Sequence, residues 1–256
     1  MKTSQLPDFS YEKKLWREGF RVVAGVDEVG RGCFAGPVVA AAVAFAPMAN
    51  AKWQMLSGIR IDDSKKLTPG QREGAEGWIK ENALTWGIGE ASVATINRLG
   101  MAKATKMAFR RAIAQAQERL RYKDTNNILI SQYPSIEYLL VDAFFIPNVP
   151  NLPTRRRKDK KGRYWKNPKG RQLAIINGDE ISASIAAASI IAKVYRDKLM
   201  TNLSKQSNYK KYGWEKNKGY GTKEHQEAIK KYGITRLHRK QFVETFLNTF
   251  SSSPVQ

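Results

Sequence analysis

Apolar residues along the chain gather into five extended runs, each bounded by turn-forming residues. The first two runs surround a glycine-rich connection and are expected to be neighbouring strands. The last two are almost continuously apolar, which is typical of parallel strands buried on both faces. The five runs are residues 21–28, 36–45, 83–93, 136–143 and 171–177.

Two long segments instead repeat their apolar residues at helical spacing. Residues 95–121 are rich in Ala, Arg and Gln and predict one long amphipathic helix. Within residues 181–199, apolar side chains recur every three or four positions, on one face of a second helix. Beyond Gln206 the chain is polar, with short helical patterns at 223–231 and 240–249. Strands and helices in this order predict a mixed α/β sheet covered on both faces.

The chain is strongly basic. Its 256 residues include 44 Lys and Arg against 23 Asp and Glu, which gives a net charge of +21 and a pI near 10. Such a charge points to a polyanionic partner, either nucleic acid or an anionic membrane. The uncharged run at 32–51 contains two Pro and two Gly, so it fits a buried strand with turns better than a membrane span. We therefore expect nucleic acid and no membrane.

The N-terminus and the cysteine content narrow the class of protein and its cellular location further. Residues 1–16 lack the apolar core of a secretory signal. Cys33 is the only cysteine, which excludes an internal disulfide and a multi-cysteine zinc site. These observations predict a cytoplasmic protein.

Acidic residues stand inside runs that are otherwise apolar and free of basic residues. Residues 124–154 and 172–192 contain no Lys or Arg, although the protein as a whole is rich in both. Burying a carboxylate without a partner costs several kcal/mol. Divalent metal ions, held for chemistry on a polyanion, are the partners that fit best. The acidic residues are Asp27, Glu28, Asp142 and Asp179.

Each of these acidic residues also has a purely structural interpretation. Asp27 and Glu28 are adjacent, and both can serve one metal site only if the strand ends or bulges there, because neighbours on a strand face opposite sides. The pair could equally form an acidic turn. Asp142 could begin a turn, and Asp179 could be the N-cap of the helix that follows it.

Residues 155–171 form a separate basic segment, with ten Lys and Arg among seventeen residues. Charge runs of this kind are commonly solvated loops. Tyr164 and Trp165 lie among the cations, however, which favours an arm that contacts a nucleic-acid strand. Both interpretations hold if the segment orders only on binding.

Five motifs in this chain occur in the order seen in the ribonuclease HII family, which the chain resembles from about Arg21 to Phe242. The resemblance implies a ribonuclease H-like fold, with a mixed five-stranded sheet flanked by helices and a C-terminal helical segment. It also implies a metal-dependent endoribonuclease that hydrolyses the RNA strand of RNA–DNA hybrids. The motifs are GVDEVGRG (25–32), DDSKKLT (62–68), LLVDAFF (139–145), NGDEISASIAAASIIAKVYRD (177–197) and KGYGTKEH (218–225).

The resemblance assigns roles to individual residues. It makes the four acidic residues the catalytic ligands of two divalent cations, Mg²⁺ or Mn²⁺. It implies cleavage on the 5′ side of a ribonucleotide embedded in duplex DNA, leaving a 3′-hydroxyl and a 5′-phosphate. The substrate-binding residues would be Gly30, Arg31 and Gly32 at the ribose 2′-hydroxyl, Tyr220 against the neighbouring sugar, and Lys65 at a phosphate. Lys193 and Arg196 lie one helical turn apart and could also meet the phosphate backbone, although an exposed helix face explains them equally well.

The same resemblance divides the chain into a catalytic domain at 1–205, which includes the basic insertion, and a C-terminal helical substrate-binding segment at 206–256. The partners would be RNA–DNA hybrids and ribonucleotide-containing duplex DNA, bound by a monomer. FVETFLNTF near the C-terminus lacks a suitably spaced Gln, so no clamp-binding motif is expected.

Two rival functions remain open at this point. His225 and His238 are the only histidines and could form an acid–base pair for metal-free RNA cleavage. Their simpler interpretation is local hydrogen bonding. A non-catalytic, basic RNA-binding protein would explain the charge, but it gives no reason for four carboxylates on runs without basic residues.

Overall fold

The computed structural model describes residues 6–47, 58–124, 135–150, 152 and 170–251. Within these residues the chain forms a five-stranded sheet with the order β3-β2-β1-β4-β5. β1 pairs antiparallel with β2, and β2 with β3, whereas β4 runs parallel to both β1 and β5. The expected mixed sheet is therefore confirmed. Its strands are β1 (Val23–Val29), β2 (Val38–Ala44), β3 (Thr85–Ala91), β4 (Tyr138–Asp142) and β5 (Gln172–Ile175).

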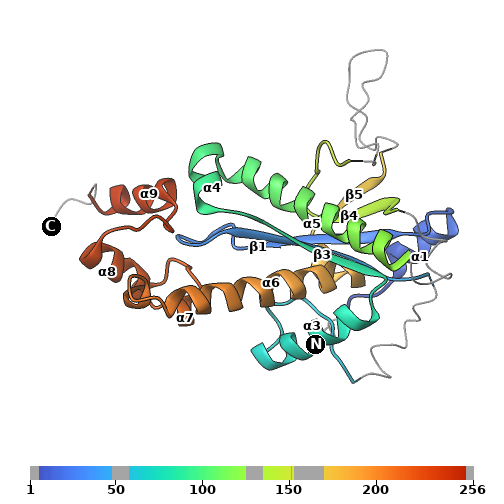
Figure 1. The fold of residues 1–256 in the computed structure, drawn as a ribbon, viewed down its shortest axis with the longest axis horizontal. Coiled ribbons are helices and arrows are strands. Elements are labelled where there is room, and N and C mark those ends of the chain that lie inside the picture. The colour runs from blue at the N-terminus through green and yellow to red at the C-terminus, as the bar shows by residue number, and fades with distance from the viewer. Residues whose placement is uncertain (1–5, 48–57, 125–134, 151, 153–169, 252–256) are drawn as a thin grey trace, which may run out of the picture.

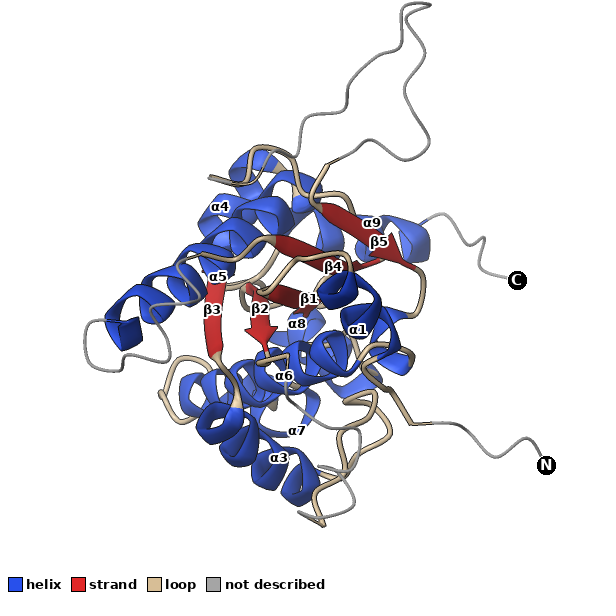
Figure 2. Ribbon diagram, turned by 90° about the vertical axis from the view of Figure 1, so that its right-hand side faces the viewer, coloured by secondary structure: helices blue, strands red, loops and turns tan. Residues whose placement is uncertain are grey.

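Long helices cover the two faces of this sheet (Figures 1 and 2). α5 (Met101–Asp124) packs on β2 and β3, and α6 (Ala183–Ser204) packs on β1 and β2 from the other side. A Cβ at Gly25 of β1 would overlap the backbone of Ser184 near the start of α6. Glycine at this position therefore lets α6 approach β1 closely, two residues before Asp27.

Two helix boundaries differ from the sequence prediction. The single helix expected over 95–121 is two helices, α4 (Val93–Leu99) and α5, because Gly100 adopts a φ of 78° and ends α4. The second helix begins after a 3-10 turn at Gly178–Glu180, and Ser182 is its N-cap. Asp179 is therefore not an N-cap, and its side chain remains available for another role.

Other helices were not anticipated. α1 (Ser10–Arg17) precedes the sheet, and α3 (Pro69–Asn82) packs against α6. Thr68 and Gln71 form a capping box at the start of α3, so the spacing of these two residues is the sequence signal for this helix.

The C-terminal part of the chain forms three helices beyond one end of the sheet, α7 (Trp214–Asn217), α8 (Lys223–Tyr232) and α9 (Lys240–Ser251) (Figure 1). The last two confirm the short helical patterns in the sequence. These helices surround a buried aromatic cluster centred on Trp214, and this cluster also contains Ala35 and Met200. The C-terminal helices therefore pack directly on α6 and on the loop between β1 and β2.

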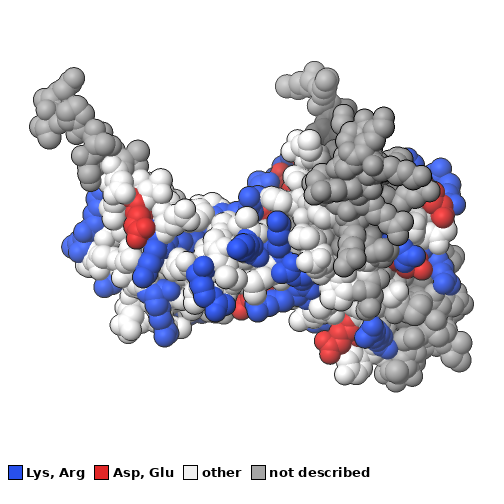
Figure 3. All heavy atoms as spheres, turned by 90° about the horizontal axis from the view of Figure 1, so that it is seen from above, with Lys and Arg blue, Asp and Glu red and all other residues white. Residues whose placement is uncertain are grey.

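Basic side chains are spread along the face shown in Figure 3, with few acidic ones among them. Most of the basic insertion at 155–171 lies outside the described residues. No helix in the part of the chain that the structure describes is long and apolar enough to cross a membrane.

Candidate active site

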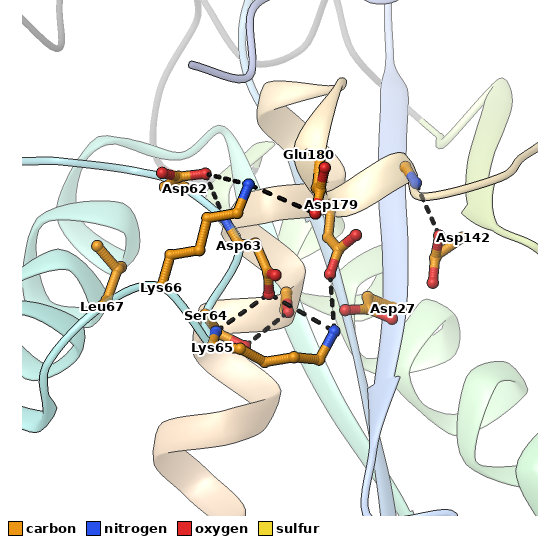
Figure 4. A network of polar contacts seen from close by, with 12 residues as sticks. Asp27, Asp62, Asp63, Ser64, Lys65, Lys66, Leu67, Asp142, Asp179 and Glu180 are labelled. Carbon is orange, nitrogen blue, oxygen red and sulfur yellow. Dashed lines mark hydrogen bonds and ion pairs between the residues drawn. The ribbon is translucent and has the colours of Figure 1, made fainter. Parts of the chain in front are cut away.

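Three of the four acidic residues lie together at the end of the central strands. Val26 of β1 pairs with Val141 of β4, so Asp27 and Asp142, the next residues on these parallel strands, are neighbours on one face. Asp179 follows β5 and lies beside Asp27 (Figure 4). The three carboxylates face α6, because Asp27 pairs with Ala41, which packs against that helix.

Asp27 is the most deeply buried of the set. Its Oδ1 accepts a hydrogen bond from the Glu28 amide at 2.6 Å, and its carboxylate is hydrogen-bonded to Ser189 of α6. Burial raises the pKa of Asp27 well above its usual value, and the nearby charges of Glu28 and Asp142 raise it further. A bound cation would therefore stabilise its ionised form.

Asp142 is positioned by the backbone around Asp179. Its Oδ1 accepts a hydrogen bond from the Gly178 amide at 2.7 Å, and a Cβ at residue 178 would crowd the Ile185 side chain of α6. Ala143, directly after Asp142, has a φ of 50°, which is rare for a residue with a side chain. The Ala143 amide donates to Ile175 at 2.8 Å, so strand β5 holds this turn in place.

Asp179 contacts a cation from a distant loop. Lys65 Nζ lies 3.3 Å from Asp179 Oδ2 and 3.6 Å from Asp63 Oδ1 (Figure 4). Burial raises the pKa of Asp179, Lys65 lowers it, and the charges of Asp63 and Asp142 raise it. The Lys65 side chain is 78% exposed, so its ammonium can move to another anion at little cost. The predicted site therefore includes Lys65 and a further carboxylate, that of Asp63.

Asp63, Ser64 and Ser189 were missed by the sequence reasoning. Ser64 Oγ and Ser189 Oγ are 2.9 Å apart, and Ser189 also contacts Asp27. The residues at 62–66 thus form a loop that is anchored on α6 and carries Lys65 to the site. The polar run DDSKKLT drew attention to this loop, but nothing in the sequence links it to Ser189.

Glu28 extends from the opposite face of the same strand end. β1 has no bulge at the acidic pair, since Glu28 pairs with Ala40 and Val29 with Val39, but the strand ends at Val29, directly after the pair. Glu28 Oε1 lies 3.4 Å from Arg31, while Oε2 is buried without a hydrogen-bond partner among the described residues. Burial raises the pKa of Glu28 to about 7, against the opposing effect of Arg31.

These carboxylates suit divalent cations on two grounds. Their oxygens are the ligands that Mg²⁺ and Mn²⁺ prefer. Burial and mutual repulsion raise the pKa of Asp27, Glu28 and Asp179, and a bound cation would reverse both effects. Among the described residues, no group of three or more acidic, His or Cys side chains is arranged to hold a metal ion. Cations at this site would need waters and the substrate's phosphates as additional ligands.

The loop after β1 brings the expected glycines beside these carboxylates. Gly30 has a φ of 90°, and a Cβ there would overlap the Arg196 side chain, so the fold itself requires glycine. Gly32 is different, because a Cβ there would meet nothing within 4 Å. Arg31 lies 4.4 Å above the Phe144 ring, next to Asp142.

Arg196 is not the surface contact that the sequence predicted. It is fully buried, and its three guanidinium nitrogens donate to the carbonyl oxygens of Pro37, Ala35 and Lys218 at 2.8–3.0 Å. Arg239, also fully buried, donates to Gly36, Pro37 and Arg31 at 2.8–3.1 Å. Helical spacing predicted an exposed position for Arg196, but the C-terminal helices cover that part of α6. Both arginines therefore hold the glycine loop in place through their bonds to its carbonyl oxygens.

Tyr220 lies at the same loop from the other side. Cys33 forms an isolated β-bridge with Tyr220, and the amides of Phe34 and Ala35 both donate to Gly219 O. The Tyr220 residue remains 38% exposed, so its ring is accessible beside the glycines. Lys193 Nζ lies 5.7 Å from this ring and 2.9 Å from Asp197 Oδ1. The structure thus brings Lys193 and Tyr220 together, although Lys193 already has an acidic partner.

The two histidines are fully buried within the C-terminal aromatic cluster. Burial lowers the pKa of His225 and brings that of His238 down to about 4. A general acid or base must reach the substrate, and neither ring does. The metal-free histidine mechanism is therefore excluded by the structure.

Comparisons with known proteins match this geometry to one family. The family model described as ribonuclease HII matches residues 24–245. The ribonuclease HII of Caldanaerobacter subterraneus subsp. tengcongensis is 41% identical over 242 residues, which cover 93% of this chain and 80% of that protein. The ribonuclease HII of a Synechococcus species is 40% identical over 236 residues, covering 92% of this chain and 88% of the relative.

Solved structures show the same fold. The ribonuclease H2 of Pyrococcus horikoshii OT3 superposes with a TM-score of 0.59 at 24% identity, over 91% of this chain and all of the other. Bst-RNase HIII in complex with Mn²⁺ superposes with a TM-score of 0.54 at 19% identity, over 90% and 70% of the two chains. With the family model matched over residues 24–245 and relatives about 40% identical over most of the chain, this chain belongs to the ribonuclease HII family of endoribonucleases.

Proposed function

We propose that this protein hydrolyses the RNA strand of RNA–DNA hybrids and cuts on the 5′ side of ribonucleotides embedded in duplex DNA, leaving 3′-hydroxyl and 5′-phosphate ends. The observation that carries the proposal is the convergence of Asp27, Asp142 and Asp179 at one strand end, with Glu28 close enough for its charge to raise the pKa of Asp27. There, burial and mutual repulsion raise the pKa of three of these carboxylates.

The four carboxylates would hold two divalent cations. Such ions, when bound, activate the attacking water and stabilise the charge of the leaving oxygen. A structural neighbour, Bst-RNase HIII, was solved with Mn²⁺, which supports divalent-metal use here. The protein itself orients the ligands: Gly178 fixes Asp142 through its amide, and Ser189 fixes Asp27.

Lys65 would contribute to substrate binding. In the structure its ammonium contacts Asp179 and Asp63 through an exposed, flexible side chain. When cations neutralise these carboxylates, a substrate phosphate becomes the stronger partner for Lys65. Lys193, beside Tyr220, would serve the next phosphate along the strand.

Ribose recognition would come from the glycine loop. The 2′-hydroxyl is the only group that distinguishes a single ribonucleotide within duplex DNA. Nothing in the described part of the protein lies within 4 Å of a Cβ placed at Gly32, so a ligand could approach the backbone closely there. The accessible Tyr220 ring would stack against the neighbouring sugar and fix the register.

The direct test uses three matched duplexes: one with a single embedded ribonucleotide, one long RNA–DNA hybrid, and one of DNA alone. We expect cleavage of the first two in Mg²⁺ or Mn²⁺, with products that carry 3′-hydroxyl ends. The all-DNA duplex should remain intact, and EDTA should abolish all cleavage. Cleavage that persists in EDTA, or products ending in a 3′-phosphate, would refute the proposed chemistry.

A further inference from the structure

We propose that the buried pair His225 and His238 sets the position of Tyr220, and so acts as a positioning element for the recognition of single ribonucleotides. This inference rests on the proposed role of Tyr220. It assigns a purpose to the two histidines, which the chemistry at the carboxylates does not use.

The hydrogen bonds of the pair determine the tautomer of each ring. His238 Nδ1 lies 2.9 Å from the Thr235 amide, which can only donate, so the proton of neutral His238 is on Nε2. His225 Nδ1 lies 2.8 Å from the carbonyl oxygen of Tyr220, which can only accept, so neutral His225 carries its proton on Nδ1.

The two tautomers fit each other without conflict. His225 Nε2 is left as a bare acceptor and receives the His238 Nε2–H at 3.2 Å. It also receives the indole N–H of Trp214 at 3.1 Å. A proton added to His225 Nε2 would make it face two other N–H donors in a fully buried site. The network therefore exists only with both rings neutral and in these tautomers.

The network connects the two segments that would read the ribose. One end is the Tyr220 carbonyl, which also accepts from the Thr222 amide at 2.9 Å. At the other end, His238 forms a β-bridge with Ala35, in the stretch that follows Gly32. The Tyr220 side chain is in turn hydrogen-bonded to Cys33. The histidine pair thus sets the spacing between the Tyr220 ring and the glycine loop.

Two substitutions at one position separate positioning from stability. His225→Asn places an amide N–H where Nδ1 was, so it retains the bond to the Tyr220 carbonyl but leaves Trp214 and His238 without their acceptor. His225→Gln places an oxygen where Nε2 was, so it retains that acceptor and loses the bond to Tyr220.

We expect His225→Gln to melt near the wild-type temperature, yet to lower kcat on the single-ribonucleotide duplex about threefold to tenfold relative to a long hybrid, the range of one net hydrogen bond. His225→Asn should lose more stability while keeping the wild-type ratio of the two activities. Equal ratios for the two variants and the wild type would overturn the proposal.

Tyr220→Ala is the control for the proposed function on which this inference rests. If it leaves the ratio of activities unchanged, Tyr220 does not read the junction, whatever the histidines do. If Tyr220→Ala changes the ratio and His225→Gln does not, the recognition role stands and the positioning role fails.

The network can also be observed directly, without any variant. The chain contains only two histidines, so ¹⁵N-labelled, untagged protein gives two imidazole spin systems. At neutral pH we expect one neutral ring protonated on Nδ1 and the other on Nε2. Two rings protonated on Nε2, or a charged ring, would show that the bond from His225 to Tyr220 is not formed.

Discussion

Glu28 shows most directly the cost of burying a carboxylate at this site. It is held in a largely buried position, one of its carboxylate oxygens has no hydrogen-bond partner among the described residues, and its pKa is raised to about 7. Without a bound cation, ionised Glu28 destabilises the folded protein, whereas the same charge in the unfolded chain is solvated. The placement of this residue therefore lowers the stability of the folded protein in favour of function.

The sign of this effect gives a pH-dependent prediction. Between the ordinary pKa of 4.5 and about 7, folded Glu28 holds its proton more tightly than the unfolded chain does. The contribution of Glu28 to stability is therefore present below pH 4.5 and is lost as the pH rises through about 7.

The substitution Glu28→Gln removes the loss of stability that ionisation of Glu28 causes at higher pH. In EDTA above neutral pH, we expect the variant to exceed the wild type in free energy of unfolding by about 1–3 kcal/mol. The difference should shrink towards pH 4.5, and Mg²⁺ should stabilise the wild type more than the variant. Urea denaturation across this pH range measures it. A variant less stable than the wild type at every pH would show that Glu28 is not electrostatically strained.

Individual site residues differ in how far the sequence could predict them. Asp27 and Asp142 were predictable because each stands at the end of an apolar run, and parallel pairing brings strand ends together. Asp63 and Ser189 were not, because Asp63 acts on Asp179, and Ser189 contacts Ser64 and Asp27, across more than 100 residues of sequence. Arg196 was placed wrongly because local helical spacing does not show what covers a helix.

At the scale of elements, the start of α6 determines where Asp179 lies. Ser182 caps this helix, and its hydroxyl also donates to Glu12 of α1 at 2.6 Å. Glu12 is fully buried and accepts a further bond from the Ser184 amide at 3.0 Å. α1 therefore fastens the turn that carries Asp179 to the rest of the fold.

Ser182→Ala should destabilise the protein by about 1–3 kcal/mol, because it removes an N-cap and one partner of a buried carboxylate. Ser92 caps α4 at a more exposed position and provides the matched control. Ser92→Ala should cost about 0.5–1 kcal/mol. The free energies of unfolding in urea compare the two, and equal losses would mean that the Glu12 contact adds nothing.

Elements with a strong apolar periodicity were predicted well, whereas the breaks within them were not. The five strands follow from apolar runs, and α8 and α9 from short helical patterns. Gly100 divides one predicted helix into two because its positive φ ends α4. The sequence alone does not show whether a glycine within a helical pattern adopts such a φ. α1 was missed because its sequence is largely polar, and the helix is held by the contacts of Glu12 with the start of α6, which the sequence does not show.

At the scale of the whole molecule, the net charge of +21 should dominate duplex binding. The basic segment at 155–171 carries ten of the cations. If it lies along the duplex, deleting it should weaken binding and flatten the salt dependence by about 0.9 per lost phosphate contact. The rate at saturating substrate should stay near wild type, because the four carboxylates lie outside the segment. An unchanged slope in a salt titration would identify 155–171 as a solvated loop.

The central claim is that the carboxylates at the end of β1 and β4 hold the cations that cleave RNA. Its most direct test is Asp142→Asn, assayed in Mg²⁺ on the single-ribonucleotide duplex. The change keeps the size of the side chain and an oxygen for the Gly178 amide, but it removes the negative charge. Turnover should be abolished, while duplex affinity stays within about threefold of wild type because phosphate contacts dominate binding. Near-normal cleavage by Asp142→Asn would contradict the account.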